Sequence, residues 1–392
     1  MTTARPPRDR ADACPGALQT HAAADGALAR VRVPGGALSV VQLRALSTAA
    51  RDLGDGALEL TSRGNVQLRG LRCGGEAELG ERLAAAGLLP SATHETVRNV
   101  LASPLSGRAG GLVDVRPWVP AFDAGLCADP ALAGLPGRFL AAFDDGRCDV
   151  AGQAADVAVL ALGPDSVALL LAGTDTGLRT TPDAAVGLAL AATRAFLDER
   201  SGQGGTAWRV AELEDGVSRI PGRFSGHCGH YGRTVDVPAA PSSGPAGAVP
   251  QDDGRTALVA VVPLGRLTAE QADLLTAVAV TDLRVTPWRS VVVPDLPDAA
   301  ATGDLTAAGL VLDPLSPWLR VTACAGRPGC AKSLADVRSD ATSAVANRTL
   351  PADGARQHWA GCERRCGRPP GDVVDVVATG SLFDPYRIET AH

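Results

Sequence analysis

The chain has 392 residues, more than one hydrophobic core usually serves, so two or three domains are expected. Hydrophobic residues make up 45% and charged residues 20%, and the formal net charge is -6. This acidic balance argues against nucleic acid or an anionic membrane as a partner, because both need a concentrated basic face.

The N-terminal residues lead into no apolar export segment, and no run reaches the roughly 20 apolar residues that span a bilayer. We therefore expect a cytoplasmic protein with no membrane partner. The nine cysteines of such a chain are expected to be thiols or metal ligands rather than disulfides.

Composition divides the chain into segments. Residues 1–30 lack periodicity and are predicted to form a flexible arm, and the Pro/Gly/Ser-rich stretch 238–256 is predicted to be a linker. Two small domains are expected over 31–80 and 257–305. A larger α+β domain is expected over 81–237, and a cysteine-rich domain over 306–392.

An internal repeat relates the two small domains, over residues 36–66 and 265–291. Each copy has a capping box, Ser39-x-x-Gln42 or Thr268-x-x-Gln271, in which the two side chains satisfy unpaired N–H groups at a helix start. Apolar residues at helical spacing follow, and then a strand-like alternation. We expect each copy to form a helix and strands, and the two copies to complete one sheet together.

Two further elements lie between the copies. The apolar runs 157–162 and 167–171 flank Gly163, Pro164 and Asp165, which predicts a β-hairpin. Residues 181–200 are predicted to form a helix with Thr181 as N-cap and Pro182 at its first position.

The cysteines near the C-terminus carry the strongest chemical pattern. Cys324 and Cys330 have five residues between them. Cys362 and Cys366 follow after 31 intervening residues and have three residues between them. Glycines and prolines in both loops let the backbone turn around a bulky cofactor, which predicts a 4Fe-4S cluster on these four thiolates. Structural zinc is one alternative, although its cysteine pairs usually have spacers of about two to four residues. Free thiols or disulfides are another.

These features resemble the sulfite and nitrite reductase superfamily. The resemblance includes the cysteine pairs, the context His358-x-x-Gly361-Cys362, the repeat, and the segments 61–67, 97–107 and 135–145. It implies an α+β fold in which two ferredoxin-like half-domains pair and two α/β sandwich domains are added. In the reductases of this superfamily, sirohaem lies against the cluster, and Cys366 would be the bridging cysteine.

Two departures from the reductases are visible. The reductases bind their anion with two basic residues, one residue apart, after a Leu-Pro motif. At these two places this chain has Arg138 and Leu140, so one anion ligand is missing. The segments 286–290 and 362–369 look more like the precorrin-3B synthase branch. That resemblance implies an oxygen-dependent monooxygenase of aerobic cobalamin biosynthesis, which hydroxylates precorrin-3A and closes a lactone. A sirohaem-dependent sulfite or nitrite reductase is the second reading, and a non-catalytic iron-sulfur or zinc protein is the third.

The precorrin-3B synthase resemblance also implies partners and a second metal. NADH would be the ultimate donor, and because no Gly-x-Gly-x-x-Gly motif follows a strand, electrons are expected from a separate reductase or ferredoxin. For the mononuclear non-haem iron that the resemblance implies, His227 and His230 are the candidates. A glycine-rich loop with polar side chains is the alternative interpretation of that segment.

A tetrapyrrole substrate is flat and fringed with carboxylates, which guanidinium forks bind with paired hydrogen bonds. By position in the resembling motifs, Arg63, Arg98 and Arg138 are the first candidates for carboxylate ligands, and Arg116 and Arg289 follow. Arginine is common on the surface of this chain, which has a single lysine, so each position alone is weak evidence. The residue that activates oxygen cannot be assigned from the pattern.

Overall fold

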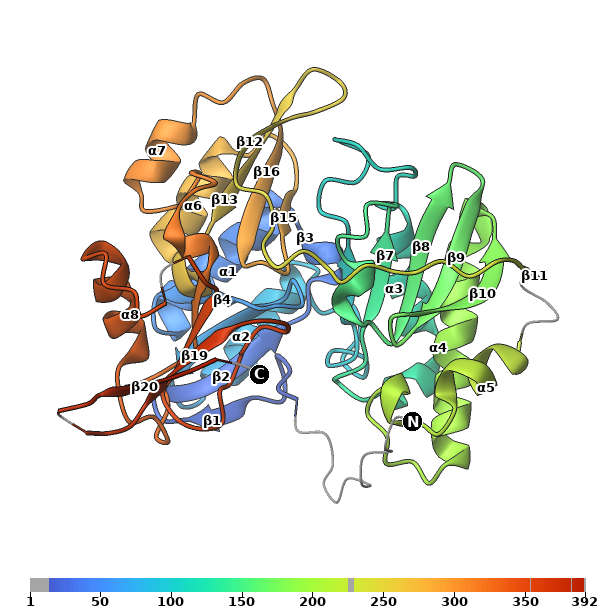
Figure 1. The fold of residues 1–392 in the computed structure, drawn as a ribbon, viewed down its shortest axis with the longest axis horizontal. Helices are drawn as coiled ribbons and strands as arrows, with labels where there is room; N and C mark the ends of the chain where they lie inside the picture. Colours follow the sequence, from blue (N-terminus) through green and yellow to red (C-terminus); the bar gives the residue numbers. More distant parts are fainter. Residues whose placement is uncertain (1–13, 225–228, 353, 382, 391–392) are drawn as a thin grey trace.

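The computed structural model describes residues 14–390 apart from 225–228, 353 and 382. The two repeat copies form two antiparallel five-stranded sheets that exchange an edge strand (Figure 1). The first sheet has the order β1-β2-β5-β4-β14, with bounds His21–Ala23, Gly26–Val31, Val66–Leu71, Ala57–Leu60 and Arg266–Thr268. The second has the order β12-β13-β16-β15-β3, with bounds Gly247–Pro250, Thr256–Val261, Ser290–Leu296, Leu283–Val285 and Ala37–Leu38.

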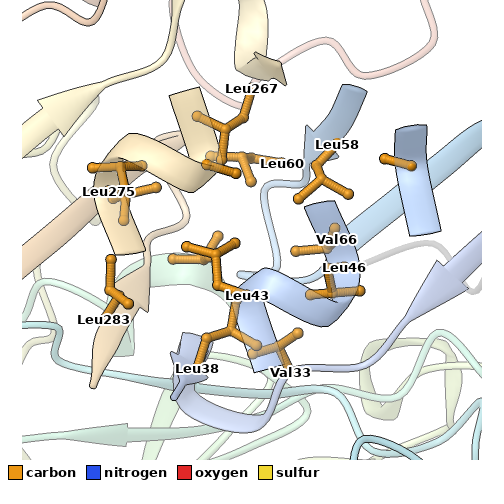
Figure 2. Close-up of a cluster of buried hydrophobic side chains, with 14 of the residues drawn as sticks. Val33, Leu38, Leu43, Leu46, Leu58, Leu60, Val66, Leu267, Leu275 and Leu283 are labelled. Carbon is orange, nitrogen blue, oxygen red and sulfur yellow. The ribbon is translucent and has the colours of Figure 1, made fainter. Parts of the chain in front are cut away.

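The expectation of one shared sheet is therefore wrong, although the two copies do pair. β14 of the second copy joins β4 of the first, and β3 of the first copy joins β15 of the second. Each exchanged strand comes directly before a helix, α1 (Val40–Leu53) or α6 (Ala269–Val278). Figure 2 shows Leu43 of α1 facing Leu275 of α6 inside one continuous apolar core. Strand exchange and helix packing thus join the two copies into a single unit.

Both predicted capping boxes are confirmed. Ser39 Oγ accepts the N–H of Gln42 at 3.1 Å, and Gln42 Oε1 accepts the N–H of Ser39 at 3.0 Å. Thr268 and Gln271 form the same pair at 3.2 and 2.9 Å.

Replacing Ser39 with alanine is expected to lower the free energy of unfolding by about 1 kcal/mol, because the backbone N–H of Gln42 at the helix start loses its acceptor, Ser39 Oγ. Thr268→Ala should have a similar effect at the equivalent position. Chemical denaturation monitored by circular dichroism measures both changes, and an unchanged stability for both variants would contradict this role.

The arm predicted over 1–30 is wrong for the residues from Pro15 onward, and residues 1–13 lie outside the described part. Ala17 and Ala29 are fully buried, and β1 and β2 belong to the first sheet. The Glu95 carboxylate holds the segment by accepting the backbone N–H groups of Ala17 and Leu18. The Glu95 carboxylate and a few small buried apolar residues hold this segment in place. Neither leaves a periodic pattern in the sequence, which is why the segment was predicted to be a flexible arm.

A six-stranded sheet forms the second body (Figure 1). Its order is β11-β10-β9-β8-β7-β6, with bounds His230–Tyr231, Thr174–Thr180, Ser166–Leu171, Val157–Gly163, Ala141–Asp144 and Val100–Ala102. The predicted hairpin is confirmed as β8 and β9. The predicted helix is confirmed as α4 (Ala185–Gly202) after a 3-10 turn at Pro182–Ala184, but the Thr181 side chain makes no capping bond. α4 and α3 (Trp118–Ala128) pack on one face of this sheet.

The C-terminal part forms a four-stranded sheet in sequence order. It contains β17 (Val321–Ala323), β18 (Gln357–Ala360), β19 (Val374–Ala378) and β20 (Tyr386–Glu389). The first three strands are parallel, and α8 (Val337–Ala346) covers the sheet. The other described α-helices are α2 (Gly75–Ala85), α5 (Gly216–Gly222) and α7 (Thr302–Ala307). Within the described ranges, no helix is long and apolar enough to cross a membrane.

Candidate functional site

The parallel pairing of β17 and β18 brings the two cysteine loops together. Ala323 pairs with Trp359, so Cys324 and Gly361 leave neighbouring strands at the same edge of the sheet. The N–H of Gly361 donates to Cys324 Sγ at 3.2 Å. The carboxyl ends of two parallel strands thus place Cys324 beside the loop that carries Cys362 and Cys366.

The loop that carries Cys330 packs against Gly361, at the start of the loop that carries Cys362 and Cys366. The Ser333 N–H donates to the carbonyl of Cys330 at 3.0 Å, and the Leu334 N–H donates to the carbonyl of Gly361 at 2.8 Å. A Cβ atom at residue 361 would lie 1.8 Å from Ser333 Oγ, so only glycine allows this approach. All four predicted cysteines therefore lie on two loops that touch each other.

The chemistry of these donors fits an iron-sulfur cluster. Burial raises the pKa of the Cys324 thiol, and the nearby Cys366 and Cys362 raise that pKa further. Without a cation the thiol form is favoured, whereas bound iron stabilises the thiolate. The N–H donation from Gly361 to Sγ is of the kind that tunes cluster potentials. Four thiols on glycine-rich loops are thus a suitable ligand set for the predicted cofactor.

The Arg69 side chain, from β5 of the first five-stranded sheet, hydrogen-bonds to the loop that carries Cys324 and Cys330. Arg69 Nη2 donates to the carbonyl of Gly329 at 2.7 Å, while Nε and Nη2 bind the Asp25 carboxylate at 3.0 Å each. The cysteine domain is thereby tied to the first half of the repeat.

A cavity of about 500 Å³ begins directly after the last cysteine. Gly367 and Arg368 line it, together with residues of both repeat copies and of the six-stranded domain. Residues 239–245, which we call the strap, line it. The strap runs from the six-stranded sheet to the second five-stranded sheet (Figure 1). The strap is mainly exposed, and the indole N–H of Trp288 donates to the carbonyl of Pro241 at 2.9 Å.

Four arginines line this cavity: Arg289, Arg320, Arg356 and Arg368. Arg368 is committed to the protein, because it binds the Asp375 carboxylate at 2.9 and 3.0 Å. Arg289 and Arg356 each donate one hydrogen bond to a backbone carbonyl, at 3.3 and 3.2 Å. Within the described ranges the Arg320 side chain makes no hydrogen bond or ion pair. Three guanidinium groups thus have donors left for an anionic ligand.

Electrostatics supports this reading for Arg289. Burial lowers its pKa, and nearby Arg338 and Arg356 lower it further, although Glu59 opposes them. A bound carboxylate would favour the charged form of Arg289, because it offsets both the loss of solvent around the guanidinium and the repulsion from the neighbouring arginines. Of the five arginines predicted from sequence, Arg289 is the one that lines the cavity.

Arg63 lies next to the cavity, since the neighbouring Ser62 lines it. In the described part of the chain, its guanidinium makes no hydrogen bond or ion pair. Burial lowers its pKa to about 10, with Arg209 as the next cause. Nearby Arg32 is 2% exposed and its buried Nη1 has no partner. Arg63 therefore keeps its place as a candidate anion ligand.

The structure does not support Arg98, Arg116 and Arg138 as ligands in this cavity. Arg98 binds the Asp123 carboxylate twice at 2.7 Å and donates to the carbonyl of Leu88. Arg116 forms a half-exposed pair with Asp114 at 2.9 and 2.8 Å. Arg138 is exposed, with its guanidinium carbon 5.2 Å from the Trp208 ring centroid. In each case a neighbouring side chain, which sequence position does not reveal, engages the guanidinium.

The structure does not test the pair of histidines predicted for a second iron site. His227 lies outside the described residues, and His230 lies exposed on the edge strand β11. Over the described ranges, Asp144, Asp145 and Asp149 form the one group of three potential ligands whose ligand atoms lie within 4.8 Å of one another. This group contains no histidine, so the geometry gives no support to a site with two histidines and a carboxylate.

Comparison with known proteins agrees with this architecture. The model of the nitrite/sulfite reductase ferredoxin-like half domain matches residues 21–86 and 249–303. A structure of the Mycobacterium tuberculosis NirA protein matches 93% of this chain and 74% of that chain, with a TM-score of 0.73 and 23% identity. The predicted α+β fold with paired ferredoxin-like half-domains is therefore confirmed.

Similar curated proteins carry two different activities. A ferredoxin–nitrite reductase of Synechococcus elongatus is 29% identical over 90% of this chain and 76% of its own length. A precorrin-3B synthase of a Sinorhizobium species is 27% identical over 95% of this chain and 82% of its own length. A ferredoxin-dependent sulfite reductase of Mycolicibacterium paratuberculosis is 29% identical over 91% and 70%. These matches, each below 30% identity, show that the chain is similar to nitrite and sulfite reductases and to a precorrin-3B synthase. The chain is accordingly an enzyme with oxidoreductase activity.

Proposed function

We propose that this oxidoreductase is an oxygen-dependent tetrapyrrole monooxygenase of the precorrin-3B synthase type. It would hydroxylate precorrin-3A and form the lactone in aerobic cobalamin biosynthesis, in the cytoplasm. The observation that carries the proposal is the arginine-lined cavity that starts at Gly367, one residue after the last candidate cluster ligand.

The cavity suits a flat ligand with a carboxylate fringe. Its volume of about 500 Å³ falls within the range of small-molecule sites. Trp288, Pro287 and Leu319 offer apolar faces for a ring, and the arginines described above offer donors for its edge. Guanidinium forks bind carboxylates with charge-assisted hydrogen bonds, so the arrangement favours a tetrapyrrole over a small inorganic anion.

The cysteine loops give this site a source of electrons. Cys324, Cys330, Cys362 and Cys366 would hold a 4Fe-4S cluster, which when bound supplies single electrons for reaction with dioxygen. The donor would be a separate reductase or ferredoxin, with NADH as the ultimate source. The ferredoxin named in two of the similar reductases supports this part of the proposal.

A specific side chain favours the synthase over an anion reductase. Leu140 occupies the second place of the basic pair, and it is 4% exposed within an apolar cluster around Ala142 and Leu160. Arg138, at the first place, lies over Trp208. The pair therefore presents no two adjacent cations to an inorganic anion.

A sirohaem-dependent sulfite or nitrite reductase remains the second candidate. The identities to the nitrite reductase and the precorrin-3B synthase are 29% and 27%, so they do not separate the two functions. The Arg63 guanidinium makes no hydrogen bond or ion pair with the described residues, so it is also available to an inorganic anion. Turnover under ¹⁸O-labelled dioxygen distinguishes the two functions. The synthase predicts label in the tetrapyrrole product, whereas reduction of sulfite or nitrite without incorporation would overturn it.

Replacing Arg356 with glutamine is expected to weaken tetrapyrrole binding about 10-fold, because one charge-assisted hydrogen bond to a carboxylate is lost. Arg63→Ala should also weaken binding while the cluster content stays unchanged. Anaerobic fluorescence titration with sirohydrochlorin, a metal-free tetrapyrrole, measures the affinities. Arg116→Gln is the matched control, since Arg116 lies outside the cavity lining. Equal affinity for the wild type and both pocket variants would refute the pocket assignment.

A further inference from the structure

A second, smaller cavity of about 200 Å³ shares a wall with the first. The strap residues Pro241, Ser243, Gly244 and Pro245 line both cavities, as does Trp288. A Cβ atom at Gly244 would lie 2.6 Å from the indole ring, so strap and ring are in close contact. Among the described residues, Arg147 and Asp149 are the charged ones that line the small cavity, and most of its wall is apolar.

Asp149 is the least compensated of three neighbouring buried carboxylates. Asp144 accepts four backbone N–H groups, at 2.8 to 3.0 Å. Asp145 binds Arg147 through two hydrogen bonds at 2.8 and 2.7 Å. Asp149 Oδ1 accepts a single hydrogen bond, from Ser103 Oγ at 2.6 Å, and the nearest Arg147 nitrogen lies 3.9 Å from Oδ2.

Among the described residues, no hydrogen bond reaches the other oxygen of Asp149, Oδ2. The residue is 9% exposed and lines the small cavity, whereas neither Asp144 nor Asp145 does so. Burial, together with the nearby Asp144 and Asp145 carboxylates, raises the pKa of Asp149 to about 7. The Ser103 hydrogen bond and Arg147 act in the opposite direction. A carboxyl group with this pKa carries and releases a proton at neutral pH.

We propose that Asp149 is an acid–base residue of the enzyme, passing a proton to a ligand atom that reaches the small cavity from beneath the strap. This inference rests on the proposed function. Hydroxylation by dioxygen takes up electrons and protons in equal number, because one oxygen atom enters a C–H bond as hydroxyl and the other leaves as water. Each hydroxylation consumes two electrons, supplied through the cluster, and two protons. Asp149 donates one of these protons to the oxygen atom that leaves as water, solvent supplies the other, and the Asp149 carboxylate is then reprotonated from solvent.

Two variants test this role through the pH profile of turnover. Asp149→Asn is expected to lower kcat about 100-fold or more, with sirohydrochlorin affinity within about twofold of the wild type. In the wild type, kcat should fall as pH rises through about 7, since the acid form is lost. Ser103→Ala removes a hydrogen bond that lowers the pKa, so the fall should move to higher pH. Asp253→Asn, an exposed carboxylate away from both cavities, should leave rate and profile unchanged.

Thermal unfolding gives a readout that does not depend on turnover. The pKa of Asp149 is higher in the folded than in the unfolded chain. Ionisation of Asp149 therefore does not lower the free energy of unfolding below about pH 4, and it lowers this free energy progressively between about pH 4 and pH 7. Asp149→Asn should therefore raise the melting temperature relative to the wild type at pH 8 but not at pH 4. An equal difference at both pH values would overturn the acidity on which the role depends.

The outcomes separate this inference from the proposed function. If the wild type binds sirohydrochlorin and turns over while Asp149→Asn keeps more than half its kcat, the acid–base role is wrong and the function stands. If Asp149→Asn loses affinity and keeps kcat, Asp149 is a binding residue and the proposal is also wrong. If the wild type binds no tetrapyrrole, the proposed function fails, and this inference fails with it.

Discussion

Replacing Cys362 with serine is expected to remove iron and sulfide from the purified protein and to abolish oxidoreductase activity. The serine hydroxyl is a poor ligand for iron in place of a thiolate, and a cluster bound to the four cysteines would hold together the two loops that leave β17 and β18. The C-terminal domain should also lose stability, because cluster binding is linked to folding. Iron and acid-labile sulfide analysis measures the first effect, and limited proteolysis measures the second.

Cys73→Ser is the matched control, since Cys73 is an exposed thiol in the loop before α2. It should retain full iron and sulfide content. Iron content in Cys362→Ser equal to that of the control would show that the ligand assignment is wrong. Zinc in place of iron in the wild type would show that the cluster itself is wrong.

Replacing Arg98 with alanine is expected to destabilise the protein by about 3–5 kcal/mol, the usual cost of leaving one partner of a buried ion pair uncompensated. The Arg98 and Asp123 side chains are 5% and 16% exposed, and three nitrogen atoms of the guanidinium donate within the protein. Removing the guanidinium leaves the Asp123 carboxylate at α3 without its cation. Chemical denaturation followed by tryptophan fluorescence measures the loss, because Trp118 begins the same helix.

Arg116→Ala provides the comparison for this effect. The Arg116 and Asp114 side chains are 35% and 38% exposed, so removing this pair should cost only about 0–1 kcal/mol. Equal stability of Arg98→Ala and Arg116→Ala would contradict the structural role of Arg98. A loss of tetrapyrrole affinity in a stable Arg98→Ala protein would restore Arg98 as a ligand.

The sequence predicted those parts of the fold that local rules govern. Hydroxyl and amide side chains three residues apart define the helix starts at Ser39 and Thr268, and two apolar runs around Gly163 define a hairpin. The spacing of Cys324, Cys330, Cys362 and Cys366 predicted two cysteine loops, and the parallel pairing of β17 and β18 brings them together. In these cases the residues that decide the structure lie within a few positions of one another.

The parts that were missed depend on distant partners. β3 and β14 have only two and three residues, too few for a visible alternation, and their exchange is decided by the packing of α1 against α6. Arg98 fits a ligand motif, but Asp123, 25 residues away, occupies its guanidinium. Arg320 and Arg356 are isolated arginines in an arginine-rich chain, and only the fold places them at one cavity.

The strap illustrates the same limit. Its proline, glycine and serine content predicted a linker over 238–256. Residues 239–245 form no helix or strand, but the prediction is wrong for Gly247–Pro250, which form β12 of the second five-stranded sheet. Residues of the strap line both cavities, which composition cannot indicate. A linker in the sequence is therefore part of the site in the folded protein.

The absorption spectrum of anaerobically purified protein, recorded before and after addition of sirohydrochlorin, tests the central claim most directly. The proposed function predicts a broad iron-sulfur shoulder without sirohaem bands, followed by perturbation of the tetrapyrrole bands on binding. Strong sirohaem bands in the protein as purified would contradict the monooxygenase and establish the reductase instead.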